Sequence, residues 1–265
     1  MIFHSSIEPV YFILPLVGFL IGLFGTMLGG GGGFFFLPIL TLLIGVPVQT
    51  AVITSLVATL PICMVGALGH YQKTNINFRI GLMFSLTGIL GAFAGARITG
   101  MVSPEQLKAG FGIYSIFIAL NMVHGTWKKK RSEAGKVLRS EDSGMRRKVK
   151  GSIFGLFAGF ITGTFGTSGT APVLAGLFSM RIPFKLVIGT SLMVVLVNTL
   201  FAVGAHFLVG RIDLMLVYFL TAGSIAGAIL GPRILTKAKT DRSENKVRYL
   251  YAAVMAAIGI LMIVR

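Results

Sequence analysis

Residues 25–38 read GTMLGGGGGFFFLP, in which five consecutive glycines separate two apolar segments. Glycine lacks a side chain and is a poor helix former, so one helix should end here and another begin. Residues 163–172 read GTFGTSGTAP and place a similar break in the second half of the chain. Both stretches lie within long apolar runs. We therefore expect two helix breaks that are buried in apolar surroundings.

The composition around these breaks is that of a membrane protein. Hydrophobic residues make up 54% of the 265 residues and charged residues 12%, and Gly occurs 35 times. The mean hydropathy is +0.86. High glycine content within long apolar runs is typical of transmembrane helices that pack closely. This composition excludes a soluble enzyme, a disordered chain and a disulfide scaffold.

The apolar runs predict an all-α, polytopic integral membrane protein with ten helical segments. Eight are long enough, at about 17–25 residues, to cross a bilayer. The two short segments each follow a glycine-rich break and should begin inside the membrane. The segments are 10–29, 34–45, 48–70, 79–100, 107–126, 151–167, 170–180, 185–209, 213–235 and 247–264.

The basic residues are clustered rather than spread, which argues against nucleic acid as a partner. The formal net charge is +16, and ten of the 24 Lys and Arg residues lie in 128–150. Loops rich in Lys and Arg stay in the cytoplasm, so loop 127–150 should be cytoplasmic. If every segment changes direction, both termini then lie outside. The sole cysteine, Cys63, excludes an internal disulfide.

The chain also repeats itself at an offset of 136 residues, from Gly30 to Gly166. Agreement of His, Arg, Pro and Thr-Ser at one offset indicates an internal repeat. The predicted units are residues 1–126, a linker 127–150 and residues 151–265. Five segments per unit place the second unit upside down, as in transporters with inverted repeats. The matched residues are Gly30 and Gly33 with Gly166 and Gly169, Pro47 with Pro183, Thr54-Ser55 with Thr190-Ser191, His70 with His206, Ile76 with Ile212, Gly91 and Gly95 with Gly227 and Gly231, and Arg97-Ile98 with Arg233-Ile234.

These motifs carry a family resemblance. The first half reads GTMLGGGGGFFFLPIL, TSL, GALGHY and GAFAGARI, and the second reads GTFGTSGTAPVL, TSL, GAHF and GAILGPRI. The chain resembles the TauE/SafE sulfite exporter family, also called the toluene-sulfonate uptake permease superfamily. The resemblance implies a multi-pass transporter of the cell inner membrane. It also implies sulfite, an organosulfonate or a related small anion as substrate, and no enzymatic activity.

Inverted-repeat transporters bind substrate near the membrane midplane, where broken helices of both halves meet. Free N–H groups at helix starts and the hydroxyls beside them would then hold the anion. Close packing of small residues is the alternative explanation of the breaks, and the favoured one for Gly91, Gly95, Gly227 and Gly231. The candidate substrate-binding residues are Gly30, Gly31, Gly32, Gly33, Thr54, Ser55, Thr167, Ser168, Gly169, Thr170, Thr190, Ser191 and Asn198.

Four further residues are candidates for gating or for attracting anions. His70 and His206 lie near segment ends and should sit at opposite membrane faces if the repeat is inverted. Arg97 and Arg233 also lie toward segment ends, where each could attract anions or place its charge among lipid headgroups. No Asp or Glu lies inside an apolar segment, and the nearest is Asp213 at the start of segment 213–235, so the sequence leaves open whether the coupling ion is H⁺ or Na⁺. It predicts no metal site and no cofactor, and it leaves the oligomeric state open.

Two alternative functions compete with transport. Broken helices also occur in channels, so an anion channel is one alternative. Residues 166–169 read GTSG and His206 follows in a later segment, which resembles the Ser–His pair of rhomboid intramembrane proteases. Ser168 would be the nucleophile and His206 its base. The repeat accounts for both residues without catalysis, because Ser168 aligns with Gly32 and His206 with His70.

Overall fold

A computed structural model describes residues 3–4, 9–27, 30–132, 144–180, 182–207, 212–235 and 241–264. The first half of the chain forms a short 3-10 turn and then five helical segments. They are η1 (Pro9–Ile13), α1 (Leu14–Met27), α2 (Gly33–Pro38) with the π turn η2 (Ile39–Leu43), α3 (Val48–Tyr71), α4 (Phe78–Thr99) and α5 (Pro104–Ser132).

The second half also forms five helices, joined to the first half through residues 133–143. These helices follow the predicted segments closely, and Pro183 stands directly before the third of them as Pro47 stands before α3. They are α6 (Gly144–Phe165), α7 (Thr170–Ser179), α8 (Phe184–Phe207), α9 (Leu214–Leu235) and α10 (Asp241–Val264).

The structure differs from the sequence prediction at three places. The short segment 34–45 is split, because Pro38 lacks an N–H donor and the helix widens to a π turn after it. The predicted linker 127–150 is partly helical: α5 extends to Ser132 and α6 begins at Gly144. Lys and Arg are good helix formers, so a helix continues beyond its apolar part.

The third difference concerns strands, which an all-α fold does not include. Two residues near the N-terminus, β1 (Phe3–His4), pair in parallel with β2 (Ile212–Asp213), which precedes α9. An extended segment that pairs with a distant part of the chain gains backbone hydrogen bonds that composition does not reveal. The described chain is otherwise helical.

Five helices in the described residues are long and apolar enough to cross a membrane: α3, α4, α5, α8 and α9. The sequence predicted eight such segments. In α1, α6 and α10 the described apolar stretches are shorter, at Tyr11–Thr26, Val149–Phe165 and Ala252–Val264. Large hydrophobic side chains such as Phe12, Leu90 and Phe117 are exposed on the outside of the helices, as expected for a surface that faces lipid.

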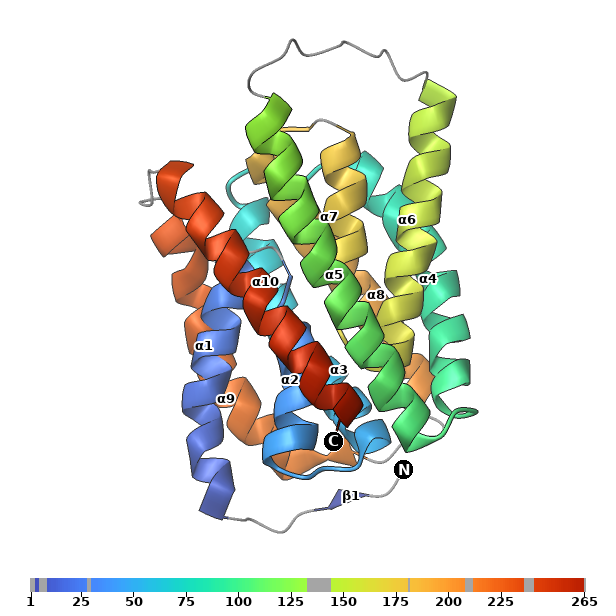
Figure 1. The fold of residues 1–265 in the computed structure, drawn as a ribbon, viewed down its shortest axis with the longest axis vertical. Coiled ribbons are helices and arrows are strands. Elements are labelled where there is room, and N and C mark those ends of the chain that lie inside the picture. The colour runs from blue at the N-terminus through green and yellow to red at the C-terminus, as the bar shows by residue number, and fades with distance from the viewer. Residues whose placement is uncertain are drawn as a thin grey trace.

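Helices of the two halves pack against each other in pairs. Helix α1 packs on α9, α4 on α6, and α3 on α8, while α5 and α10 lie side by side across one face (Figure 1). A Cβ on Gly91 or Gly95 of α4 would overlap main-chain atoms of α6, and one on Gly227 or Gly231 of α9 would overlap atoms of α1. The prediction that these four glycines serve close helix packing is confirmed.

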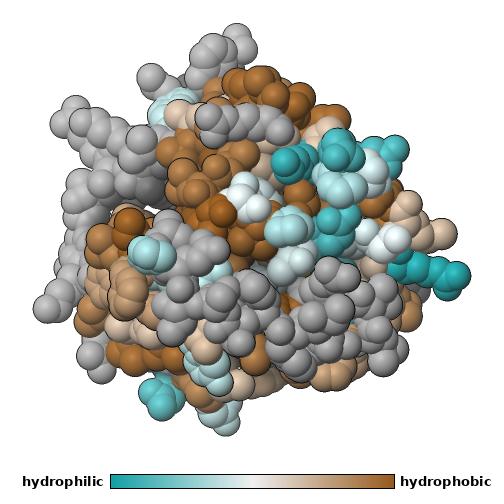
Figure 2. Space-filling model, turned by 90° about the horizontal axis from the view of Figure 1, so that it is seen from below, coloured by the Kyte–Doolittle hydropathy of each residue, from teal (hydrophilic) through white to brown (hydrophobic). Residues whose placement is uncertain are grey.

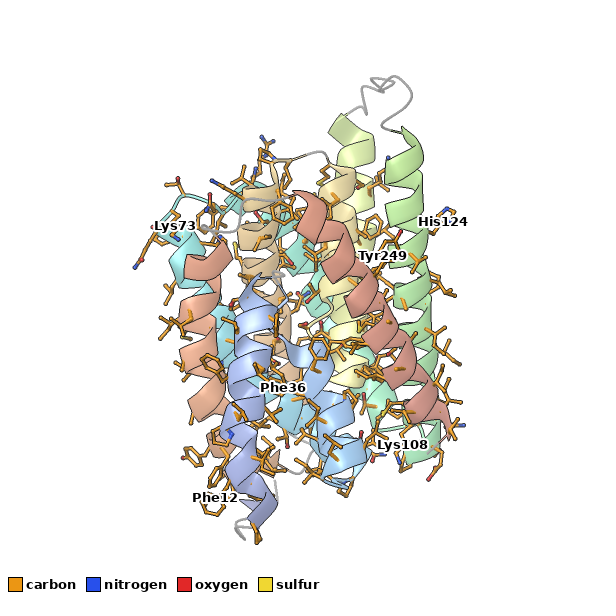
Figure 3. The ribbon with its side chains drawn as sticks, turned by 60° about the vertical axis from the view of Figure 1, so that its left-hand side comes forward. Phe12, Phe36, Lys73, Lys108, His124 and Tyr249 are labelled. Atoms are coloured by element: carbon orange, nitrogen blue, oxygen red, sulfur yellow. The ribbon has the colours of Figure 1, made fainter. Side chains whose placement is uncertain are left out.

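Labelled residues and chain ends identify the two ends of the molecule. Lys73 and His124 lie at one end, and Phe12 and Lys108 lie at the other (Figure 3). Helix α10 ends at the same end as the start of α1, opposite the end of α5 and the start of α6 (Figure 1). Seen from below, hydrophilic residues gather over part of this end, with hydrophobic residues around them (Figure 2).

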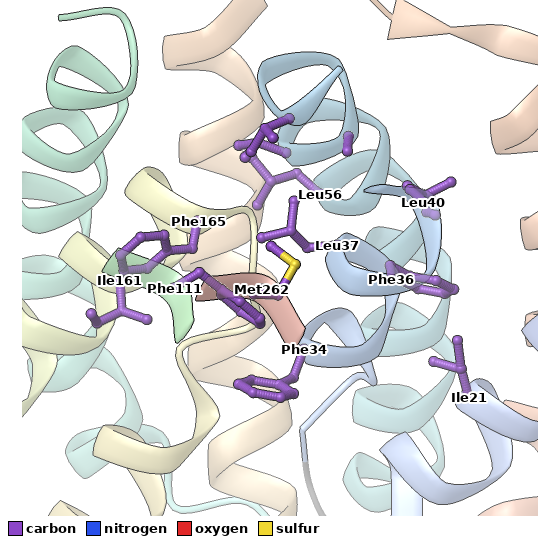
Figure 4. Packing of buried hydrophobic residues seen from close by; sticks show 14 of the residues in the cluster. Ile21, Phe34, Phe36, Leu37, Leu40, Leu56, Phe111, Ile161, Phe165 and Met262 are labelled. Carbon is purple, nitrogen blue, oxygen red and sulfur yellow. The ribbon is translucent and has the colours of Figure 1, made fainter. Parts of the chain in front are cut away.

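The largest buried cluster lies beside the first break. It includes Phe34 and Phe36 of α2, Phe111 of α5, Phe165 of α6 and Met262 of α10, and Phe34 lies beside Phe111 (Figure 4). The ring centroids of Phe34 and Phe111 are 5.0 Å apart, and those of Phe111 and Phe165 are 5.9 Å apart. This apolar packing holds the start of α2 next to the end of α6.

Candidate functional site

The two helix breaks touch each other. The Thr170 hydroxyl donates a hydrogen bond to the Gly30 carbonyl oxygen at 3.0 Å. The Ser168 and Thr170 hydroxyl oxygens are 2.7 Å apart. Because Thr170 gives its proton to Gly30, Ser168 is the donor in this second bond. A Cβ on Gly33 would lie 3.0 Å from the Ser168 nitrogen, so the main chains of the two breaks also meet.

Four glycines give the breaks their path. Gly31, Gly32, Gly166 and Gly169 have φ values of 62°, 73°, 64° and 53°, in the left-handed region that side chains disfavour. In the first break, the Gly25 carbonyl accepts hydrogen bonds from Gly30 and Gly31 at 2.7 and 3.2 Å. Gly32 and Gly169 are the N-caps of α2 and α7, and neither helix has a side-chain cap. The first N–H groups of each helix have no acceptor within their own helix.

The first break has no room for side chains. A Cβ on Gly31 would overlap the sulfur of Cys63 and the methyl of Thr59, and one on Gly32 would overlap Ile21 of α1. The backbone itself therefore forms the surface of this break.

Ser55 fastens α3 to the second break. Its hydroxyl lies 2.7 Å from the Gly166 carbonyl and 2.9 Å from the Val52 carbonyl of its own helix. A hydroxyl has one proton, so these two acceptors share it. Ser55 was predicted to contact substrate, and the structure places its hydroxyl on the protein backbone beside the breaks.

The other hydroxyls of the Thr-Ser motifs lie in different surroundings. Thr190 accepts a hydrogen bond from the Asn77 N–H at 2.9 Å, at the connection between α3 and α4. The Thr54 hydroxyl is buried and has no partner among the described residues. Ser191 is buried on α8. The structure thus brings Ser55 to the breaks and directs Thr190 to a loop.

Two further predicted residues are buried with unpaired polar atoms. Thr167 in the second break and Asn198 on α8 are 1% and 0% exposed. Neither the Thr167 hydroxyl nor either amide atom of Asn198 has a hydrogen-bond partner among the described residues. Burial of unpaired polar groups is costly in apolar surroundings, so these atoms are available to a ligand or to water.

Sequence reasoning missed Thr59 and Cys63, both of which contact the first break. They follow Ser55 at intervals of four residues on α3 and so share its face. The Thr59 hydroxyl donates to the Ser55 carbonyl at 2.7 Å and also adjoins Gly33. The spacing 55, 59, 63 was the available signal, but position 59 corresponds to Val195 in the other half and so gave no match in the repeat.

The candidate gating residues differ from one another. His206 lies 2.7 Å through Nε2 from the Gly163 carbonyl, three residues before the second break. A carbonyl only accepts, so Nε2 carries the proton. His70 is equally buried at 5% exposure, yet neither ring nitrogen has a partner among the described residues. Arg97 is exposed near the end of α4, and the side chain of Arg233 lies outside the described part of the chain.

These contacts do not support a Ser–His catalytic pair. Ser168 bonds to Thr170, whereas His206 bonds to Gly163. The buried polar side chains among the described residues are those of Ser, Thr, Asn and His, with no Lys, Arg, Asp or Glu. The breaks therefore lie in neutral surroundings that offer hydrogen bonds rather than a fixed charge.

A model of the sulfite exporter TauE/SafE family matches residues 14–262. The chain belongs to the TauE/SafE family. It is 29% identical to the probable membrane transporter protein YdhB of Bacillus subtilis, over 83% of this chain and 89% of that protein. It is also 29% identical to a probable membrane transporter protein of Xylella fastidiosa, over 94% of this chain and 92% of that protein.

The similarity extends to archaea. A probable membrane transporter protein of Methanocaldococcus jannaschii is 25% identical over 95% of this chain and 94% of that protein. No solved structure matches the chain. Membership of TauE/SafE makes this chain a multi-pass membrane transporter rather than an enzyme, in agreement with the family predicted from the sequence.

Proposed function

We propose that this TauE/SafE chain is a secondary transporter of a small anion, favouring sulfite or an organosulfonate. The anion binds where the two breaks meet, and alternating access exposes that place to one side of the membrane and then the other. The observation that carries the proposal is the contact of Gly30 with Thr170 and of Gly33 with Ser168, because it joins the two halves at the breaks.

Helix α7 supplies the attraction for an anion. Its first N–H groups, at Thr170 and Ala171, lack acceptors within the helix, and its N-terminus carries about half a positive charge. Ser168 and Thr170 add hydroxyls at the same point. A bound anion would accept the hydrogen bond that the Ser168 hydroxyl now donates to Thr170. A sulfonate has several acceptor oxygens and suits such a group of donors.

The helix pairing supports an inverted repeat. Each helix has a counterpart in the other half, in the order α1 with α6, α3 with α8, α4 with α9 and α5 with α10. When every helix is replaced by its counterpart, the contact of α1 with α9 becomes the contact of α6 with α4. The contacts of α3 with α8 and of α5 with α10 stay the same. Helices α2 and α7 occupy opposite halves of the molecule in Figure 1. Rocking of one half against the other would then open the two ends alternately.

The orientation follows from charge. Lys73 lies at the same end of the molecule as His124 of α5, and residues 128–150, which follow His124 in the sequence, include ten basic residues. We place this end in the cytoplasm and both termini outside. The surrounding lipid bilayer is the remaining partner, and either H⁺ or Na⁺ serves as the coupling ion.

Binding by purified protein tests the proposal. Thermal unfolding is measured with sulfite, sulfate, thiosulfate, ethanesulfonate, isethionate, taurine, acetate, lactate and a cationic control. A ligand that binds only the folded state raises its apparent stability. We expect one or more sulfur-containing anions to raise the unfolding temperature, and we expect Ser168→Ala and Gly32→Leu to remove that effect.

Gly69→Leu is the matched control, because nothing lies within 4 Å of a Cβ at Gly69. It should insert and bind as the natural protein does. No stabilisation by any anion would overturn the proposed function. Flux experiments in liposomes separate a transporter from a channel. For a transporter, substrate added outside should accelerate the efflux of labelled anion from inside the liposomes. An efflux rate that does not depend on external substrate would show a channel.

A further inference from the structure

Asn198 is the most unusual buried side chain near the breaks. It is 0% exposed on α8, a helix apolar enough to cross the membrane. Neither its oxygen nor its nitrogen has a hydrogen-bond partner among the described residues. An unpaired buried amide costs about 1–3 kcal/mol. Such an amide has a donor and an acceptor available to bind a ligand.

Its position is set by a glycine of the neighbouring helix. A Cβ on Gly88 of α4 would overlap all three terminal atoms of the Asn198 amide, so glycine is what allows the amide to lie there. The Gly88 carbonyl in turn adjoins Gly159 of α6. The preceding residue, Ala158, presents its carbonyl to Gly169 of the second break. Gly88, which the Asn198 amide contacts, and Gly169 at the start of α7 therefore adjoin the same turn of α6.

A second unpaired polar group lies on the same helix as Gly88. Ser85 is one helical turn before Gly88 on the same face of α4. It is 2% exposed, and its hydroxyl has no partner among the described residues. None of the described buried residues carries a fixed charge. The surroundings of Asn198 are therefore polar, neutral and short of partners.

The chemistry of the amide selects the ligand. Asn offers N–H donors and a carbonyl acceptor, and a hydroxyl group offers one proton and two lone pairs. An alkyl end would leave both amide atoms unpaired. A second anionic group would be repelled by the amide oxygen, and no basic residue stands there to hold it. A neutral hydroxyl satisfies the site best.

We propose that Asn198, with Ser85, recognises a hydroxyl group on the organic part of an anion whose acidic group is held at the second break. This inference rests on the proposed function. It makes the preferred substrate a hydroxylated organic anion rather than sulfite or an unsubstituted alkylsulfonate.

Two ligands that differ by one hydroxyl test it. The dissociation constants of ethanesulfonate and 2-hydroxyethanesulfonate are measured on the purified full-length protein by calorimetry. The natural protein should bind the hydroxylated anion about 10-fold more tightly, as expected for one hydrogen bond to a buried amide. The nearly isosteric Asn198→Leu should remove this preference.

Ser85→Ala is the second variant and should reduce the preference several-fold. Thr221→Val is the matched control. Thr221 lies on α9 at the position equivalent to Ser85 and also has an unpaired buried hydroxyl, but the residue equivalent to Asn198 there is Ile62. The Thr221→Val variant should keep the preference for the hydroxylated anion. Equal affinity of the natural protein for both sulfonates, or a preference that survives Asn198→Leu, would overturn the inference alone. Absence of binding by every anion would overturn the proposed function as well.

Discussion

The two helix breaks are built from different residues although they occupy equivalent places in the sequence. The first break is made of glycines only, and Thr59 and Cys63 of α3 press against it. The second carries Thr167, Ser168 and Thr170, and Ser55 holds its backbone. The two breaks therefore offer a ligand different groups. The first offers backbone atoms only, and the second also offers side-chain hydroxyl groups.

The first break should be sensitive to added volume. Gly31→Val would place a branched side chain at a φ of 62° and against the Cys63 sulfur. Backbone strain and overpacking each cost about 1–3 kcal/mol, so we expect a loss of transport of about 100-fold or more. The rate of anion uptake into liposomes measures this loss. Gly69→Val is the control, because nothing lies within 4 Å of a Cβ at that position. Transport within a few-fold of normal would show that the break tolerates side chains.

The two histidines offer the next largest effect. His206 bonds to the Gly163 carbonyl just before the second break, and His70 has no such bond among the described residues. His206→Ala should free the end of α6 and raise access to the breaks from the outside about 5-fold, the equivalent of one hydrogen bond of about 1 kcal/mol. His70→Ala should not raise it.

Cys63 reports this access directly. It is the only cysteine, it is buried, and it lies against Gly31. Its rate of modification by a membrane-impermeant thiol reagent added outside gives the measurement, and Cys63→Ala gives the background. Equal rates of Cys63 modification in His206→Ala and His70→Ala would show that the two histidines do not differ in their effect on access to the breaks.

The hydroxyls of α3 should differ in their effect on stability. Ser55→Ala leaves the Gly166 carbonyl without its donor, which should cost about 1–3 kcal/mol. Thr59→Val removes only a bond within its own helix and should cost less than about 1 kcal/mol. Thermal unfolding in lipid nanodiscs compares them. A larger loss in Thr59→Val would reverse the assigned roles.

Thr190→Val should give the smallest effect on binding. Thr190 accepts the Asn77 N–H at the connection between α3 and α4 and does not contact the breaks. Its loss should lower stability by about 1 kcal/mol. The affinity for the best anion in the binding panel should change less than about 2-fold. A large loss of affinity would return Thr190 to the binding site.

The helical class and the TauE/SafE family were predictable from the sequence, as were the glycine-rich stretches between α1 and α2 and between α6 and α7. Apolar runs mark helices in a membrane, and Gly29–Gly33 cannot sustain one. The strand pair of β1 with β2 was not predictable, because it joins residues far apart in the chain. The inverted repeat, the orientation and the anion site stay predictions, supported by the helix pairing and by the contact of the breaks.

The sequence by itself determined where helices break and which residues resist burial, because these properties are local to glycine, proline and the charged side chains. The tertiary structure decided which hydroxyls are still available. Ser55 and Thr190 belong to the same repeated motif, yet one meets Gly166 and the other meets Asn77. Asn198 likewise became informative only when α4 presented Gly88 to it. Hydrogen-bond partners depend on which helix faces which, and distance along the chain does not specify that.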